Sequence, residues 1–159
     1  MPRKGKVKRR PIQPDPIYKS KLVTKLINRS MISGKKTVAR KHIYNAFKII
    51  KEEKGIDPKT VFDQAMDNLK PQVEVRSRRV GGAAYQVPMP VRGSRQNSLA
   101  IRWLVQAARE RPNKQYHTYG EKLAAEIIDA SEGQGAAFTK KQQVERTAEA
   151  NKAFSHLRW

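Results

Sequence analysis

The sequence predicts a mainly α-helical protein: a bundle of about six helices, one inserted two-stranded β-hairpin and a disordered basic N-terminal arm. Apolar residues recur with helical spacing through most of residues 20–153. Residues 73–91 alternate instead with the period of a strand, on either side of a Gly-Gly pair. Residues 1–19 combine prolines and cations, with no acid before Asp15. These observations predict an arm, a single helical domain carrying a ribbon, and a short tail at residues 154–159.

The composition points to a polyanionic partner. The chain has 159 residues, which suits one domain, and 34 Lys+Arg against 14 Asp+Glu give a formal net charge of +20. Such a charge opposes compaction unless a polyanion offsets it, so nucleic acid is the expected partner, with salt-sensitive binding. An anionic membrane is a weaker candidate, since no stretch approaches the ~20 apolar residues of a span. The absence of cysteine excludes disulfides and thiolate sites.

The N-terminal arm is defined by its cations and prolines. Its prolines oppose a regular helix, and its length without acids predicts a chain that orders only on a polyanion. The cations of its first part are Arg3, Lys4, Lys6, Lys8, Arg9 and Arg10. This segment lacks the apolar core of a signal peptide, so we expect the protein to stay in the compartment where it is made.

The first three helices follow from apolar stripes and capping residues. A helix beginning at Ser20 has an apolar face of Leu22, Val23, Leu26, Ile27 and Met31. A second, over about residues 35–54, is expected to bury Val38, Ile43, Ala46, Phe47 and Ile50 and to end at Gly55. Asp57-Pro58 is typical of a helix start and Pro71 of a stop; the stripe between them is Val61, Phe62, Ala65, Met66 and Leu69.

The segment 73–91 is expected to form a β-hairpin that projects from the helices. Gly81-Gly82 suits a tight turn, because only glycine enters positive φ without steric cost. A two-stranded ribbon is unstable alone, so its base must lean on helices. Its tip carries groups that suit phosphates and stacked bases, namely Arg76, Arg78, Arg79 and Tyr85. The alternative is a solvated hairpin whose arginines serve only solubility.

Three further helices complete the bundle. The fourth, capped by Ser94 or Asn97 and ending near Arg111, is the most apolar and is expected to be central, with Arg95, Arg102, Arg109 and Arg111 on its solvent side. Thr118-x-x-Glu121 has the spacing of a capping box and opens the fifth. The sixth, over about residues 139–153, has few apolar residues and is expected to be peripheral.

The sequence offers no recognisable active site. Gly34-Lys35-Lys36 lacks the other residues of a phosphate-binding P-loop, and Gly133-x-Gly135 lacks a third glycine. His42, His117 and His156 are scattered rather than spaced as a zinc pair. We therefore predict no enzyme activity, no metal and no cofactor. An RNA-processing enzyme would need clustered acids or histidines.

Three stretches carry a family resemblance. Asp15-Pro-Ile-Tyr-Lys-Ser20, with Lys25-Leu-Ile-Asn-Arg29 and Met31-Ile-Ser-Gly-Lys-Lys36 after it, resembles the opening signature of small-subunit ribosomal protein seven, bacterial type. Arg78-Arg-Val-Gly-Gly-Ala-Ala-Tyr-Gln-Val-Pro88 resembles its hairpin, and Ala148-Glu-Ala-Asn-Lys-Ala-Phe-Ser-His-Leu-Arg-Trp159 its C-terminus. The resemblance spans nearly the whole chain in the right order.

The resemblance implies a ribosomal RNA-binding protein that nucleates the head of the small subunit, in a bacterial cytoplasm or an organelle that translates its own genes. It implies rRNA contacts at Lys4, Lys6, Lys8, Arg9, Arg10, Lys25, Lys35, Lys36, Arg76, Arg78, Arg95, Arg102, Lys114 and Tyr116. It places the exit-site tRNA and mRNA near Arg79, Gly81, Gly82 and Tyr85, and ribosomal protein eleven near Phe154 and Trp159. It implies no membrane and no homo-oligomer. The alternative is a general basic architectural protein or RNA chaperone acting on RNA or DNA.

Overall fold

The structure is a computed structural model that describes residue 5 and residues 11–158 of the chain. The predictions for Lys4, Lys6, Lys8, Arg9, Arg10 and Trp159 lie outside the described residues. The helices are α1 (Lys21–Ser30), α2 (Lys36–Lys54), α3 (Pro58–Leu69), α4 (Gly93–Glu110), α5 (Tyr119–Ser131), α6 (Gly135–Ala150) and the 3₁₀ helix η1 (Lys152–Leu157). The strands are β1 (Val73–Val80) and β2 (Ala83–Pro90). The predicted mainly α-helical fold with one inserted hairpin is confirmed.

The helix starts follow the local signals in the sequence. The Ser20 hydroxyl accepts from Leu22 N at 3.2 Å, and Asp57 caps α3 immediately before Pro58. At α5, the Thr118 hydroxyl accepts from Glu121 N while the Glu121 carboxylate accepts from Thr118 N, which is the predicted capping box. Gly55, with φ of 65°, ends α2 in the left-handed conformation that glycine enters without cost.

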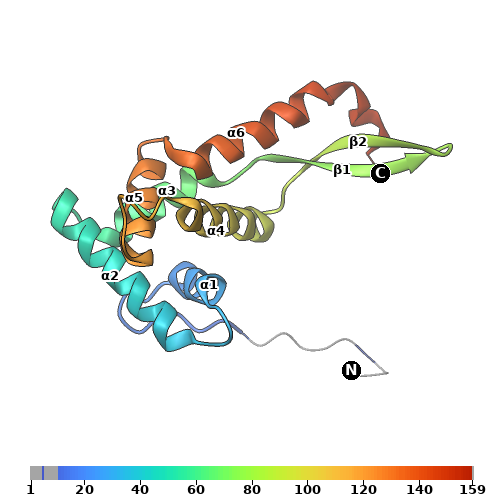
Figure 1. Ribbon diagram of the computed structural model, residues 1–159. Helices are drawn as coiled ribbons and strands as arrows, with labels where there is room; N and C mark the ends of the chain where they lie inside the picture. Colours follow the sequence, from blue (N-terminus) through green and yellow to red (C-terminus); the bar gives the residue numbers. More distant parts are fainter. Residues whose placement is uncertain (1–4, 6–10, 159) are drawn as a thin grey trace.

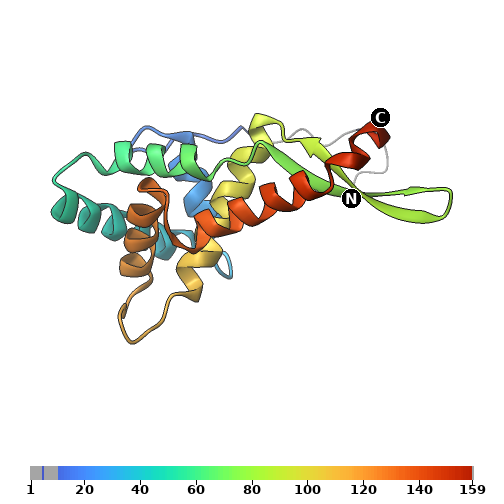
Figure 2. The same cartoon turned by 90° about the horizontal axis from the view of Figure 1, so that it is seen from above.

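The core lies among α1 to α5, and a thinner extension leaves it. Phe47, Phe62, Leu104 and Ile127 have no exposed surface, and α5 packs against α2, α3 and α4. The hairpin and α6 leave this body side by side, with α6 against β1 and η1 against β2 (Figures 1 and 2). The extension therefore rests its ribbon on a helix, as a two-stranded sheet requires.

The hairpin has the predicted turn and register. Its antiparallel pairs run from Val73 opposite Pro90 to Val80 opposite Ala83. Gly81 and Gly82 connect the strands with φ of 59° and 90°, the positive values of a tight two-residue turn. At the base, Val91 N donates to Gln72 O at 3.0 Å, so the ribbon is closed where it joins the body.

The structure corrects the predicted start of the folded chain. The sequence predicts a disordered arm up to residue 19, but Asp15 is only 2% exposed. Its carboxylate accepts from Tyr44 Oη at 2.9 Å and from Ile17 N at 3.1 Å. Burial, followed by this hydrogen bond, raises the pKa of Tyr44 to about 12. The chain is therefore attached to α2 from Asp15 onward.

Several local predictions are wrong for physical reasons. Val38 is 47% exposed and Ala39 is buried in its place, because α2 turns the stripe of residues 39, 43, 46, 47 and 50 inward. Neither Ser94 nor Asn97 caps α4, which begins at Gly93 with no side-chain cap. The last helix starts at Gly135 rather than residue 139, and η1 occupies most of the predicted tail. Only Ala137 and Ala148 of α6 are buried, which confirms that this helix is peripheral.

Candidate nucleic-acid interface

The predicted contact residues lie on three separate parts of the molecule. One group is on α1 and at the start of α2, namely Lys25, Lys35 and Lys36. A second is on the hairpin and the outer side of α4, namely Arg76, Arg78, Arg79, Gly81, Gly82, Tyr85, Arg95 and Arg102. A third is in the α4–α5 loop, namely Lys114 and Tyr116. The hairpin turn lies at the end of the molecule far from α2 (Figure 1).

Several of the predicted cations have no acidic partner within the part of the chain that the structure describes. Lys25, Lys35, Lys36, Arg102 and Lys114 make no ion pair with any other described residue. All but Lys25, which is half-buried, are exposed. Cations left without acids are available to phosphates, whereas paired cations must first give up a partner.

The hairpin tip and the C-terminal segment contact each other. The rings of Tyr85 on β2 and Phe154 on η1 lie 5.3 Å apart between centroids, tilted by 52°. One predicted tRNA-proximal residue thus packs against one predicted partner-protein residue. Arg79, by contrast, is exposed beside the turn.

In the half of the hairpin nearer the body, a buried acid joins two predicted contact residues. One of them, Arg76, was predicted at the tip but lies opposite Val87, in the half of β1 away from the turn. Glu74 on β1 is 6% exposed. Its Oε1 accepts from Arg76 Nε at 2.7 Å, and its Oε2 accepts from Arg95 Nε at 2.7 Å. Burial alone would raise the pKa of Glu74, but hydrogen bonds from Arg95 and Arg76 lower it below its ordinary value. The carboxylate therefore stays charged and links the ribbon to α4.

Sequence reasoning missed the role of Glu74. The sequence analysis assigned no function to this residue. The spacing Glu74-x-Arg76 was a usable signal, because residues two apart in a strand share a face. The partner on α4 was not visible in the same way, because Arg95 is 21 residues away in sequence.

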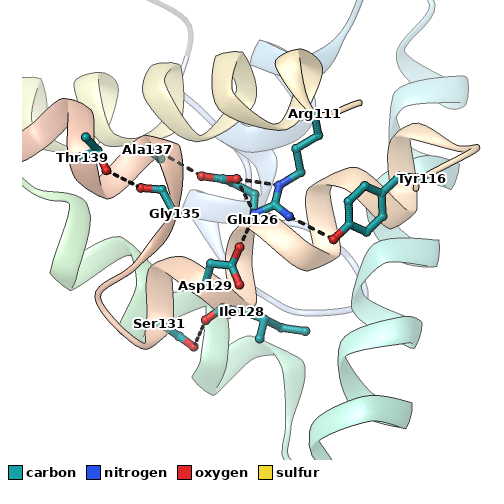
Figure 3. A network of polar contacts seen from close by, with 9 residues as sticks. All are labelled: Arg111, Tyr116, Glu126, Ile128, Asp129, Ser131, Gly135, Ala137 and Thr139. Carbon is teal, nitrogen blue, oxygen red and sulfur yellow. Dashed lines mark hydrogen bonds and ion pairs between the residues drawn. The ribbon is translucent and has the colours of Figure 1, made fainter. Parts of the chain in front are cut away.

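The α4–α5 loop is held by a second charged cluster (Figure 3). Arg111, at the end of α4, donates to Glu126 Oε2 at 2.7 Å, to Tyr116 Oη at 3.2 Å and to Asp129. Glu126 is 1% exposed, and its Oε1 accepts from Ala137 N at 2.9 Å. Arg111 was predicted on the solvent side of its helix, but only 16% of its side chain is exposed. That prediction is wrong because two acids of α5 draw the guanidinium inward.

This cluster shapes what the loop presents. The pKa of Arg111 is raised: burial lowers it, but hydrogen bonds from the guanidinium to Asp129 and Glu126 outweigh that effect. Tyr116 lies under the same guanidinium, 5.4 Å from ring centroid to Cζ, so this ring is engaged within the protein. Lys122 Nζ donates to Arg111 O and Asn113 Oδ1, each at 2.6 Å. Lys114 is left exposed on a loop fixed at both ends.

Two other kinds of site find no support in the described part of the chain. No three His, Cys, Asp or Glu side chains within it lie close enough together to hold a metal ion. Among its helices, none combines the length and apolar character that crossing a membrane would require.

Comparison with known proteins gives a consistent answer. A family model described as "Ribosomal protein S7p/S5e" matches residues 2–152. The chain is 58% identical over 159 residues to a "Small ribosomal subunit protein uS7" of Carboxydothermus hydrogenoformans, with 100% of each chain covered. Proteins of the same name from Acetivibrio thermocellus and Thermoanaerobacter sp. are 56% and 57% identical, again over 100% of each chain.

Proposed function

Because the chain belongs to the ribosomal protein S7p/S5e family, we propose that it binds the 3′ major domain of small-subunit rRNA and nucleates assembly of the subunit head. As a member of that family it is a structural, non-enzymatic component of the small ribosomal subunit, which in bacteria lies in the cytoplasm. Its neighbours are therefore rRNA and other ribosomal proteins. The proposal concerns which RNA is bound, by which residues, and with what consequence.

The observation that carries the proposal is the distribution of cations without acidic partners. They lie on α1, at the start of α2, on α4 and in the α4–α5 loop, so several elements of one folded body present cations to RNA. Each phosphate neutralised releases counterions, which supplies affinity, and several contacts on a rigid body select one arrangement of RNA helices. A protein of this form stabilises a junction rather than a duplex. The proposed contact residues of the described chain are Lys25, Lys35, Lys36, Arg76, Arg78, Arg95, Arg102, Lys114 and Tyr116, with Lys4, Lys6, Lys8, Arg9 and Arg10 of the arm added from the sequence alone.

The hairpin and the C-terminal segment are proposed to contact other components of the ribosome. We assign the ribbon tip, with Arg79, Gly81, Gly82 and Tyr85, to the neighbourhood of exit-site tRNA and mRNA. Arg79 and the two glycines are exposed, and the turn stands away from the body (Figure 2). The C-terminal segment is assigned to ribosomal protein eleven. Since Phe154 packs on Tyr85, a protein bound at η1 would also bear on the ribbon.

The test is a salt-titrated binding curve against the 3′ major domain of small-subunit rRNA, with tRNA and duplex DNA as competitors. We expect one saturable complex that survives excess competitor, with a steep dependence of log K on log salt. Equal binding to all three nucleic acids, lost together as salt rises, would overturn the proposal in favour of a general basic architectural protein. In subunits reconstituted with Arg79→Ala, exit-site tRNA retention should fall; unchanged retention would exclude the tip's part.

A further inference from the structure

We propose that Glu74 is the positioning residue of a phosphate clamp formed by Arg76 of the hairpin and Arg95 of α4, which takes one phosphodiester of an RNA backbone. The inference rests on the proposed function only for the nature of the polyanion. The clamp itself is argued from the geometry at the base of the hairpin.

The first argument is the way one carboxylate holds two guanidinium groups. Arg76 donates through Nε at 2.7 Å and lies within 2.6 Å through Nη2, while Arg95 Nε lies 2.7 and 2.8 Å from the two carboxylate oxygens. Both bonds through Nε fix the plane of a side chain that is otherwise among the most mobile in proteins. Two arginines from different elements are thus held side by side before any ligand arrives.

The second argument is what remains free after these bonds form. The acid is buried, with 8% of its side chain exposed, whereas the arginine side chains are 52% and 48% exposed. A guanidinium has five N–H donors, and neither terminal nitrogen of Arg95 has a hydrogen-bond partner in the described part of the chain. The bonded nitrogens therefore point at the buried acid, and the two terminal nitrogens of Arg95 are left for a phosphate.

The third argument is the charge. Two guanidinium groups and one carboxylate leave a formal charge of +1 on the cluster, which matches one phosphodiester. Without the acid, the two cations would repel each other and separate. A solvated ion pair that merely docks the hairpin on α4 is the plain alternative. The two explanations differ in the sign of one measurable effect.

The decisive variant is Glu74→Gln, measured against the 3′ major domain of rRNA at several salt concentrations. Removing an acid from a basic surface should strengthen RNA binding if charge alone matters. If Glu74 positions the arginines, binding should instead weaken about tenfold, as expected when a charge-assisted contact is lost. The salt slope should also fall by roughly 0.7 to 0.9, the contribution of one phosphate.

Glu149→Gln is the matched control. It makes the same change in net charge on α6, at an exposed carboxylate that makes no hydrogen bond or ion pair with another described residue. Its affinity should equal that of the original protein or rise slightly. Tighter or unchanged binding by Glu74→Gln as well would overturn the clamp.

A double-mutant cycle separates positioning from loss of fold. In a protein already carrying Arg76→Ala and Arg95→Ala, adding Glu74→Gln should no longer weaken binding. A further tenfold loss in that background would overturn the proposal, because Glu74 would then act without the arginines. If Glu74→Gln alone does not fold, Arg76→Lys with Arg95→Lys keeps both charges and removes the planar forks. About tenfold weaker binding by that variant supports the clamp, and unchanged binding overturns it.

Failure of the clamp can be told apart from failure of the proposed function. If the original protein binds the rRNA domain selectively and Glu74→Gln is unchanged, the clamp fails while the rRNA assignment stands. If the original protein fails to select the rRNA domain over tRNA and DNA, the assignment fails. The same variants on a competitor nucleic acid would then still report whether the clamp takes a phosphate.

Discussion

Two charged clusters in this protein contain the same chemical groups in inverse proportion. At the end of α4, one arginine is shared by two acids, Glu126 and Asp129 (Figure 3). At the base of the hairpin, one acid is shared by two arginines, Arg76 and Arg95. The first cluster has an excess of negative charge and the second an excess of positive charge.

The cluster around Arg111 is also more deeply buried than the cluster around Glu74. In the first cluster the central arginine and Glu126 are 16% and 1% exposed, so the pair is largely shielded from water. In the second, only the central acid is buried. A shielded pair fixes structure because breaking it leaves a charge in a poor solvent. A half-exposed pair of cations around a buried acid leaves donors for a ligand. The comparison thus distinguishes a cluster that stabilises the fold, around Arg111, from a cluster on a binding surface, around Glu74.

The largest expected effect is on the first cluster. Arg111→Met should lower the free energy of unfolding by about 3 kcal/mol or more, because Glu126 would remain buried without its cation. Chemical denaturation followed by circular dichroism measures this. Arg102→Met on the exposed side of α4 is the control and should change stability by less than about 0.5 kcal/mol. Equal stability for both variants would show that the cluster is not a tie.

A smaller effect is expected where the tie reaches the α4–α5 loop. Lys122→Met removes two hydrogen bonds from a part-buried ammonium group, to Arg111 O and Asn113 Oδ1, and should cost about 1.5 to 3 kcal/mol. Amide hydrogen exchange should quicken in residues 113–117. Lys114→Met, in the exposed part of the loop, should leave both stability and exchange nearly unchanged. Equal exchange in the two variants would show that Lys122 does not hold the loop.

The local structure of this fold could be predicted from the sequence, but the two charged clusters could not. The stripes of α1 and α3, the Gly81-Gly82 turn and the Thr118–Glu121 capping box depend on neighbours within a few residues, and each was predicted. The ties Arg111–Glu126 and Arg95–Glu74 join residues 15 and 21 positions apart, so no periodicity reveals them. Arg111 was therefore misplaced on the solvent side. Val38 was misplaced because it lies at the edge of the apolar stripe, where the sequence pattern does not show whether a residue is buried or exposed.

The smallest expected effect is on the stability contributed by the second cluster. Glu74→Gln should lower the free energy of unfolding at neutral pH by about 1 kcal/mol at most, since both arginines can turn to water. The folded protein lowers the pKa of Glu74 below its ordinary value of 4.5, with the arginine hydrogen bonds outweighing burial. A lowered folded pKa gives stability that is present above 4.5 and is lost as pH falls through the folded value.

The difference in stability between the original protein and Glu74→Gln should therefore shrink as pH falls below 4.5, and remain constant above it. Denaturation midpoints across that range measure it. A difference that stays constant through acid pH would mean that the carboxylate charge does not hold the arginines, and the distinction between the two clusters would fail. A large loss of unfolding free energy at neutral pH would instead show that Glu74 stabilises the fold, as Arg111 does. If Glu74→Gln causes a small, acid-sensitive loss of stability together with weaker RNA binding, the cluster at the hairpin serves RNA binding. The cluster around Arg111 would then differ from it by serving stability.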